Sequence, residues 1–292
     1  MTVQKEPTRT GTIMAQQSRT AGRVLIQSGT VVALILLIIF FFAMRPDTFL
    51  SFVNIRNILY QISILAIIAG AQTIVMVLGD FDLSVGATSS LAGAVTSVML
   101  LDENSMPVAI GAGLAVGILV GLVNGVLIAY LNLSAFVATL ATMTSVIGLA
   151  YLVTGGTTVF GMPAEFNALG QGRFLNVPLP VYFAVGISII IWALLRFTTL
   201  GRRLHAIGGN VEVARLSGVN VRWARLLAFT MAGFVSAIGG ILLAARLGSA
   251  AIIGVMSNGL NILGVNAYVQ QVVTGLIIIL AVVLSGLKTR ER

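Results

Sequence analysis

The stretch "VVALILLIIFFFAM", residues 31–44, contains no polar and no charged side chain. Its apolar residues follow one another without the alternation of a membrane β-strand, which repeats apolar and polar positions over about ten residues. A helix satisfies its own backbone hydrogen bonds and can therefore cross a bilayer without polar partners. The stretch predicts a membrane helix and argues against a β-barrel.

The composition extends this conclusion to the whole chain. Of its 292 residues, 58% are hydrophobic and 9% are charged, whereas a soluble domain has about 25% charged residues. The net charge of +8 is typical of loops held against an anionic cytoplasmic leaflet, and we do not expect nucleic acid as a partner. The chain has no cysteine, which excludes disulfides and thiolate metal sites.

Several further runs are long enough to span a bilayer, which takes about 20 apolar residues in a helix. The candidate spans are 24–44, 57–78, 84–101, 107–131, 135–154, 178–196, 226–245, 250–265 and 268–287. The run 24–44 is too long for a signal-peptide core, so we expect an uncleaved first span. We predict an all-α polytopic membrane protein with about 9–10 transmembrane helices, including broken or re-entrant segments.

The basic residues predict the orientation, because they favour the cytoplasmic side. Arginines gather in 196–225, whereas the loop 102–106, "DENSM", is acidic. We therefore expect cytoplasmic tails at 1–23 and 288–292 and a transmembrane domain at 24–287. The alternation fails after 226–245, since nine full spans would place the basic C-terminal tail outside. Either 250–265 does not span, or a crossing is missing near 245–255.

Two carboxylates interrupt the apolar pattern in "VLGDFDLSVGA", residues 77–87. A charge at bilayer depth costs at least about 2.5–3.5 kcal/mol, so such residues face a cavity or a partner. We favour a helix break, in which Asp82 or Ser84 caps a helix beginning at Val85. The break residues are Gly79, Asp80, Asp82, Ser84 and Gly86. Proton coupling through Asp80 or Asp82 is an alternative, and an Asp-x-Asp metal–diphosphate site is a weaker one.

The segment "NVEVARLSG", residues 210–218, predicts a short helix within an arginine-rich connection. Asn210 is a good N-cap, Glu212 suits the first turn, and Gly218 suits the position after the last turn. Without further information, the connection is a solvated basic loop.

Three stretches together resemble the permease subunit of bacterial ATP-binding-cassette importers for monosaccharides, in the ribose-type branch. They are "GDFDLSVGA" at 79–87, "TLGRRLHAIGGNVEVARLSGVNV" at 199–221 and "SNGLNILGVNAYVQQVVTGLIIILAVVL" at 257–284. Two departures stand out. The family usually has a glycine where Asp80 stands, and it carries roughly 40 more residues, with another crossing, between the equivalents of Ser249 and Ile252.

The resemblance implies a function for the connection 197–222, which becomes the coupling loop that docks on an ATPase subunit. The coupling residues would be Gly208, Gly209, Asn210, Glu212, Ala214, Arg215, Leu216 and Gly218. The implied partners are an ATPase subunit or tandem ATPase, an extracytoplasmic sugar-binding protein and a second permease copy in a homodimer. The implied location is the bacterial inner membrane.

The remaining polar residues within spans are candidates for lining a sugar path, or for hydrogen bonding between helices. The path candidates are Gln72, Asn124, Thr139, Asn258 and Asn261. Lys5 and Lys288 are the only lysines, and neither belongs to a Walker A motif, so we expect no enzyme activity, cofactor or metal in this chain. The rival function is a secondary transporter driven by protons, and a non-transporting assembly subunit is a further alternative.

Overall fold

The structure is a computed structural model of the chain and describes residues 29–157 and 159–248. Helices dominate this part of the chain, and its strands form one short antiparallel pair. Backbone contacts divide the chain into a first unit, Met1–Ile58, and a second unit, Leu59–Arg292. Helix α4, Phe52–Val77, begins in the first unit and continues in the second.

The first unit contains α2, Gly29–Met44, and the short helix α3, Pro46–Phe49. Pro46 stands at the start of α3, where its missing N–H has no intrahelical acceptor to lose. The Ser51 hydroxyl donates to the Thr48 carbonyl at 2.7 Å, and the Asn54 amide donates to the Phe49 carbonyl at 2.8 Å. These side chains satisfy carbonyls that the end of a helix leaves without a partner.

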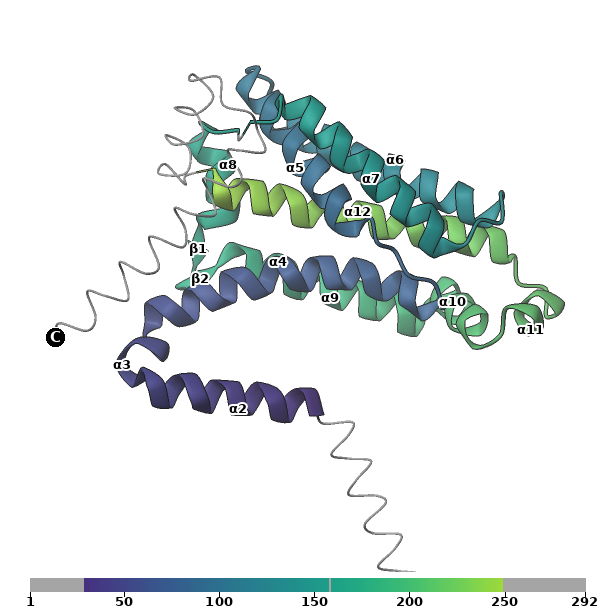
Figure 1. Cartoon of the computed structure of the whole chain (residues 1–292), viewed down its shortest axis with the longest axis horizontal. Helices are drawn as coiled ribbons and strands as arrows, with labels where there is room; N and C mark the ends of the chain where they lie inside the picture. The colour runs from purple at the N-terminus through teal and green to yellow at the C-terminus, as the bar shows by residue number, and fades with distance from the viewer. Residues whose placement is uncertain (1–28, 158, 249–292) are drawn as a thin grey trace, which may run out of the picture. The chain divides into compact units, whose positions relative to one another are not determined.

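The second unit contains the rest of the described elements. After α4 they are α5 (Val85–Leu101), α6 (Met106–Ala129), α7 (Ala135–Thr154), α8 (Ala164–Gln171), β1 (Arg173–Phe174), β2 (Val177–Pro178), α9 (Leu179–Phe197), α10 (Thr199–Gly209), α11 (Val211–Leu216) and α12 (Val221–Leu247). Figure 1 shows α8 and the β1–β2 pair at one end of this unit, and α10 and α11 at the opposite end.

Five described helices are long and apolar enough to cross a membrane, namely α4, α6, α7, α9 and α12. Helix α5 and the part Leu34–Met44 of α2 are apolar but shorter. Each overlaps one of the spans predicted between 24–44 and 226–245, so the expectation of an all-α polytopic membrane protein is confirmed. The expected spans 250–265 and 268–287 lie outside the described residues.

Helix α12 lies at the centre of the second unit, where it packs most extensively against α6 and then against α5. Glycines at 113, 117, 121 and 125 recur every four residues on α6 and therefore share one face. A Cβ on Gly117 would meet the Gly233 carbonyl of α12, and a Cβ on Gly121 would meet the Phe229 carbonyl. The glycines thus bring the α6 and α12 backbones together, because small residues at helical spacing permit close approach.

Candidate functional site at a helix break

The break segment, which we define as residues 78–84, connects α4 to α5 and begins with a compact helix end. Gly79 has φ +89°, a conformation that favours glycine. The Gly79 N–H donates to the Met76 carbonyl at 3.0 Å, and the Asp80 N–H donates to the Val75 carbonyl at 3.3 Å. This pair of bonds is a Schellman motif, which satisfies the last carbonyls of α4 and turns the chain away from the helix axis.

Asp82 organises the second half of the break segment and is 3% exposed. Its Oδ1 accepts hydrogen bonds from the Ser84 N–H and from the Ser84 hydroxyl, each at 2.7 Å. Helix α5 then begins at Val85, as predicted. Ser84 occupies the N-cap position, but its side chain makes no capping bond and Asp82 accepts no helical N–H, so the expected cap is replaced by a turn that precedes the helix.

Polar side chains from three helices hydrogen-bond to the break segment. Asn124 of α6 donates to the Ser84 hydroxyl at 2.8 Å, and Thr139 of α7 accepts from the Leu83 N–H at 3.1 Å. The Gln72 amide of α4 faces the Asp82 peptide. In the amide orientation that satisfies both groups, Gln72 donates to the Asp82 carbonyl at 2.9 Å and accepts from the Asp82 N–H at 3.3 Å.

Asp80 has a basic partner from the start of α12. Arg225 Nε lies 3.1 Å from Asp80 Oδ2, and the two side chains are 25% and 15% exposed. The two atoms are close enough for an ion pair, but their angles do not meet the criteria for a hydrogen bond. Removal of one partner would leave a largely buried charge, at a cost of about 1–3 kcal/mol.

Helix α10 packs directly against the break segment. A Cβ on Gly208 of α10 would meet the Val77 carbonyl, and a Cβ on Gly79 would lie 3.6 Å from the Gly208 Cα. Leu204 and Ile207 of α10 share a buried cluster with Val75 near the end of α4 and with Leu78 of the break segment. The connection read from sequence as a loop is therefore a helix from Thr199 to Gly209, and its apolar side faces the break.

Helix α11 follows, and the two ends predicted for it are confirmed. Asn210 Oδ1 accepts from the N–H groups of Glu212 and Val213 at 2.9 and 3.0 Å. Gly218 has φ +81°, and bonds from the Gly218 and Val219 N–H groups form a second Schellman motif. A helix of six residues is marginal without such ends, so capping explains why this one forms.

Helix α11 has one buried residue on its inner side and exposed residues on its outer face. Ala214 is buried and belongs to the cluster that includes Leu204 and Ile207. Val213 and Leu216 are 58% and 78% exposed. Arg215 pairs with Glu212 on the same helix at 2.6 Å, and because both side chains are exposed this pair adds little stability. The outer face of α11 is therefore an apolar patch beside a neutralised charge pair.

The structure thus brings together residues that the sequence assigned to separate categories. Gln72, Asn124 and Thr139 were candidates for lining a sugar path. All three instead hydrogen-bond to the break segment, which agrees with the alternative of bonding between helices. Gly86 lies in the first turn of α5, and a Cβ there would meet open space. The path candidates Asn258 and Asn261 lie outside the described residues.

Two contributors were missed, namely Arg225 and the close approach of Gly208. Arg225 entered the sequence argument only as one of several cytoplasmic arginines. Nothing in the spacing of the sequence pairs it with a carboxylate in a loop so far upstream. The apolar positions Leu200, Leu204 and Ile207, spaced for one helix face, were a signal for α10 that the glycines obscured.

Comparison with known proteins identifies relatives along most of the chain. Residues 54–287 match the family described as "Branched-chain amino acid transport system / permease component". The ribose import permease protein RbsC of Haemophilus influenzae is 34% identical over 302 residues, which cover 89% of this chain and 93% of the relative. The L-arabinose transport system permease protein AraH of Escherichia coli is 33% identical over 308 residues, covering 93% and 94%.

A third relative, the galactose/methyl galactoside import permease protein MglC of Haemophilus influenzae, is 31% identical over 324 residues, covering 92% of this chain and 96% of the relative. No solved structure matches. These alignments are longer than the 292-residue chain yet leave part of it uncovered, so the relatives hold residues without a counterpart here. The family predicted from three sequence stretches is confirmed, and the chain belongs to the permease components of the branched-chain amino acid transport system family.

Proposed function

We propose that this chain is the membrane permease subunit of an ATP-binding-cassette importer that carries a monosaccharide. The names of its relatives specify ribose, L-arabinose, galactose and methyl galactoside. A pentose or hexose is therefore the substrate class that we assign to this chain. The energy comes from ATP hydrolysis in a partner subunit, and an extracytoplasmic binding protein delivers the sugar.

Helix α11 is the element that the ATPase subunit binds in this proposal. The observation that carries it is the construction of α11: a short helix capped at both ends, anchored by buried Ala214, with Val213 and Leu216 facing outward. An exposed apolar face on a rigid short helix fits a groove on a partner, because its residues are ordered before binding. The arginines around α11 favour the cytoplasmic side for it, because basic residues are enriched there.

The break segment is the next component that would move when α11 is displaced. Gly208 packs against the end of α4, and Arg225 holds Asp80. A displacement of the α10–α11 segment, residues 199–216, would therefore also shift the junction of α4 and α5. Both carboxylates have partners in this arrangement, and none of these contacts requires a proton to move.

The remaining assignments follow from the positive-inside rule and from the family. The N-terminus, residues 1–23, and the C-terminal residues 288–292 are cytoplasmic, and 24–287 form the transmembrane domain of a bacterial inner-membrane protein. Transport takes place in a complex with a second permease copy, two ATPase domains and a binding protein.

A matched pair of leucines tests the docking of the ATPase. Leu216 on α11 is 78% exposed and Leu175 in the β1–β2 turn is 79% exposed, at opposite ends of the second unit. Leu216→Asp and Leu175→Asp each place a carboxylate on an exposed position, so neither disturbs the core. The tagged variants are purified from membranes of the native cells, and co-purifying ATP hydrolysis and its Walker A-containing subunit are measured.

We expect Leu216→Asp to lose the ATPase by at least about tenfold, because a carboxylate at a hot spot of the interface costs about 2 kcal/mol or more. Leu175→Asp retains it. Equal retention by both variants would show that α11 is not the docking element. Uptake of labelled ribose, arabinose and galactose by intact cells, tested separately, identifies the sugar, and uptake that survives ATP depletion would contradict the proposed energy source.

A further inference from the structure

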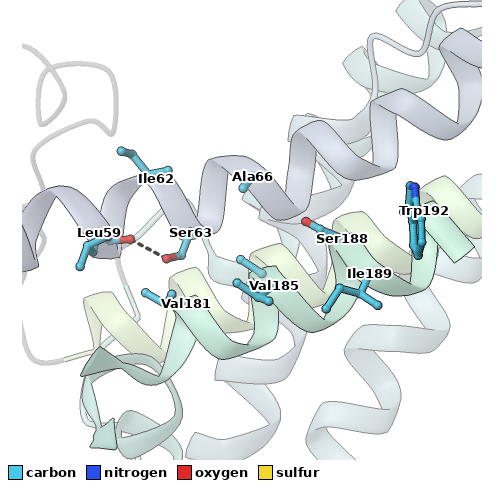
Figure 2. A pocket seen from close by; sticks show the side chains of 10 residues that line it. Leu59, Ile62, Ser63, Ala66, Val181, Val185, Ser188, Ile189 and Trp192 are labelled. Atoms are coloured by element: carbon cyan, nitrogen blue, oxygen red, sulfur yellow. Dashed lines mark hydrogen bonds between the residues drawn. The ribbon is translucent and has the colours of Figure 1, made fainter. Parts of the chain in front are cut away.

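An apolar groove lies between α4 and α9 in the second unit (Figure 2). Its volume is about 390 Å³, and its lining includes Ile62 of α4 and Val185, Ile189 and Trp192 of α9. The one hydrogen bond drawn in it joins the Ser63 hydroxyl to the Leu59 carbonyl at 2.5 Å, within α4 (Figure 2). That bond occupies the Ser63 donor, and Ser188 of α9 is the other polar side chain in a lining that is otherwise apolar.

A second cavity shares one lining residue with this groove. It has a volume of about 460 Å³ and is lined by Trp192, Leu195, Arg196, Arg202 and His205. Trp192 lines both cavities, so the apolar groove and the basic cavity meet at this side chain. Following α9 toward α10, the surface changes from aliphatic to aromatic and then to cationic.

The cations of the second cavity lack acidic partners. Among the described residues, the ion pairs join Arg215 to Glu212 and Arg225 to Asp80, and neither involves Arg196 or Arg202. His205 Nδ1 lies 2.8 Å from the Gly201 carbonyl, so this nitrogen donates there. Within the described part of the chain, the two guanidinium groups of this cavity therefore have no acidic side chain paired with them.

We propose that the groove and the basic cavity together bind one phospholipid with an anionic headgroup from the cytoplasmic leaflet. Its phosphate contacts Arg196 and Arg202, and an acyl chain lies along Val185 and Ile189. Tryptophan prefers the depth between headgroups and acyl chains, which is where Trp192 stands in this order. Anionic lipids and arginines are both enriched on the cytoplasmic side.

The length of the site agrees with one leaflet. From Val181 to Trp192, α9 rises about 16 Å at 1.5 Å per residue, close to half of a hydrocarbon core about 30 Å thick. The headgroup would lie where α9 ends at Phe197 and α10 begins at Thr199. The bound lipid therefore supports the junction that positions α10 against the break segment.

Lipid binding by the purified full-length chain tests the headgroup part of the site. Dissociation constants for phosphatidylglycerol and phosphatidylcholine are measured in detergent by native mass spectrometry for wild type and Arg196→Gln/Arg202→Gln. The matched control, Arg203→Gln/Arg222→Gln, removes the same charge from the same end of the unit but from residues outside the basic cavity.

An arginine near a membrane surface contributes about 1 kcal/mol toward an anionic lipid, or about fivefold in affinity. We therefore expect the cavity double variant to bind phosphatidylglycerol on the order of twentyfold more weakly, with the control within about twofold of wild type. An equal loss of phosphatidylglycerol affinity in both double variants would show that total positive charge, rather than the basic cavity, explains the binding. That result would overturn the proposal. Displacement of the lipid by inorganic phosphate would likewise overturn it, because an anion site alone would then explain the binding.

The acyl part is tested with Val185→Trp, which fills the groove, and with Ile190→Trp, which places the same ring on a residue of α9 outside the groove lining. We expect only Val185→Trp to weaken phosphatidylglycerol binding. The chain lacks cysteine, so Ile189→Cys provides a single reporter. Phosphatidylglycerol should slow its maleimide labelling. Labelling unaffected by lipid, or disulfide dimers through Cys at this position, would show that protein occupies the groove and would contradict the proposal.

Discussion

The contact between α6 and α12 and the break segment hold the second unit together in opposite ways. Glycines let the α6 and α12 backbones touch along several turns, without a charged side chain at the contact. The break segment instead contains Asp80 and Asp82, and polar side chains from α4, α6, α7 and α12 bind to it. One region depends on close packing, and the other depends on directional polar bonds.

This difference indicates which region is scaffold and which can switch. Backbones in van der Waals contact have one good arrangement, because any displacement opens voids or produces overlaps. Hydrogen bonds and ion pairs can exchange partners when a neighbouring element moves, so a polar segment can have two discrete arrangements. We therefore expect substitutions at the α6–α12 contact to affect folding, and substitutions around the break segment to affect transport.

The largest effect should come from Gly121→Leu on α6. Its side chain would overlap the Phe229 carbonyl and the Thr230 backbone of α12, so the helices must separate. We expect a loss of stability of about 3 kcal/mol or more. The measurement is the yield of monodisperse protein and its thermal unfolding in detergent.

Gly111→Leu is the matched control on the same helix, because a Cβ there meets nothing within 4 Å. It should leave unfolding unchanged or raise the midpoint slightly, since glycine weakens a helix interior. If both variants behaved alike, close packing of α6 on α12 would not be what stabilises the unit.

A smaller effect should follow removal of the Asp82 acceptor. Asp82→Ala loses both bonds from Ser84, at a cost of about 2 kcal/mol. Asp82→Asn keeps an oxygen that can accept them and should retain most stability and most sugar uptake. Thermal unfolding and uptake are measured for both variants. Uptake abolished by Asp82→Asn in a stable protein would favour a proton-transferring carboxylate instead.

The smallest effect should be confined to α11. Asn210→Ala removes the side-chain cap of this six-residue helix, at about 1 kcal/mol. We expect faster hydrogen exchange at residues 211–216, with little change in global unfolding. Asn220→Ala removes the corresponding cap of the much longer α12 and should leave exchange in α11 unchanged. Equal exchange in the two variants would mean that packing, rather than capping, orders α11.

Much of this architecture follows from local sequence. The spans are readable because each is a long apolar run, and the ends of α11 are readable because Asn210 and Gly218 act within a few residues. The position of the helix break is readable for the same reason, since Gly79 ends α4 and Asp82 forms the turn before α5 through local bonds.

The partners of the break segment could not be read in this way. The pairing of Asp80 with Arg225 depends on where α12 passes the end of α4, and no periodicity records that. Asn124 and Thr139 look like any polar residue within a span, and only the packing of α6 and α7 directs them to Ser84 and Leu83. Helix α10 was overlooked because its glycines are typical of loops, although here Gly208 permits contact with α4.

The central claim is that the Asp80–Arg225 pair couples the break segment to the start of α12, which follows the α10–α11 segment in the chain. A double-mutant cycle tests it most directly, with Asp80→Asn, Arg225→Gln and the combined variant in proteoliposomes containing the ATPase and binding protein. The measured quantity is sugar transported per ATP hydrolysed. We expect each single variant to lower this ratio and the combined variant to be no worse than either, which gives a coupling energy of about 1 kcal/mol or more. Independent, additive effects on the ratio would contradict the claim.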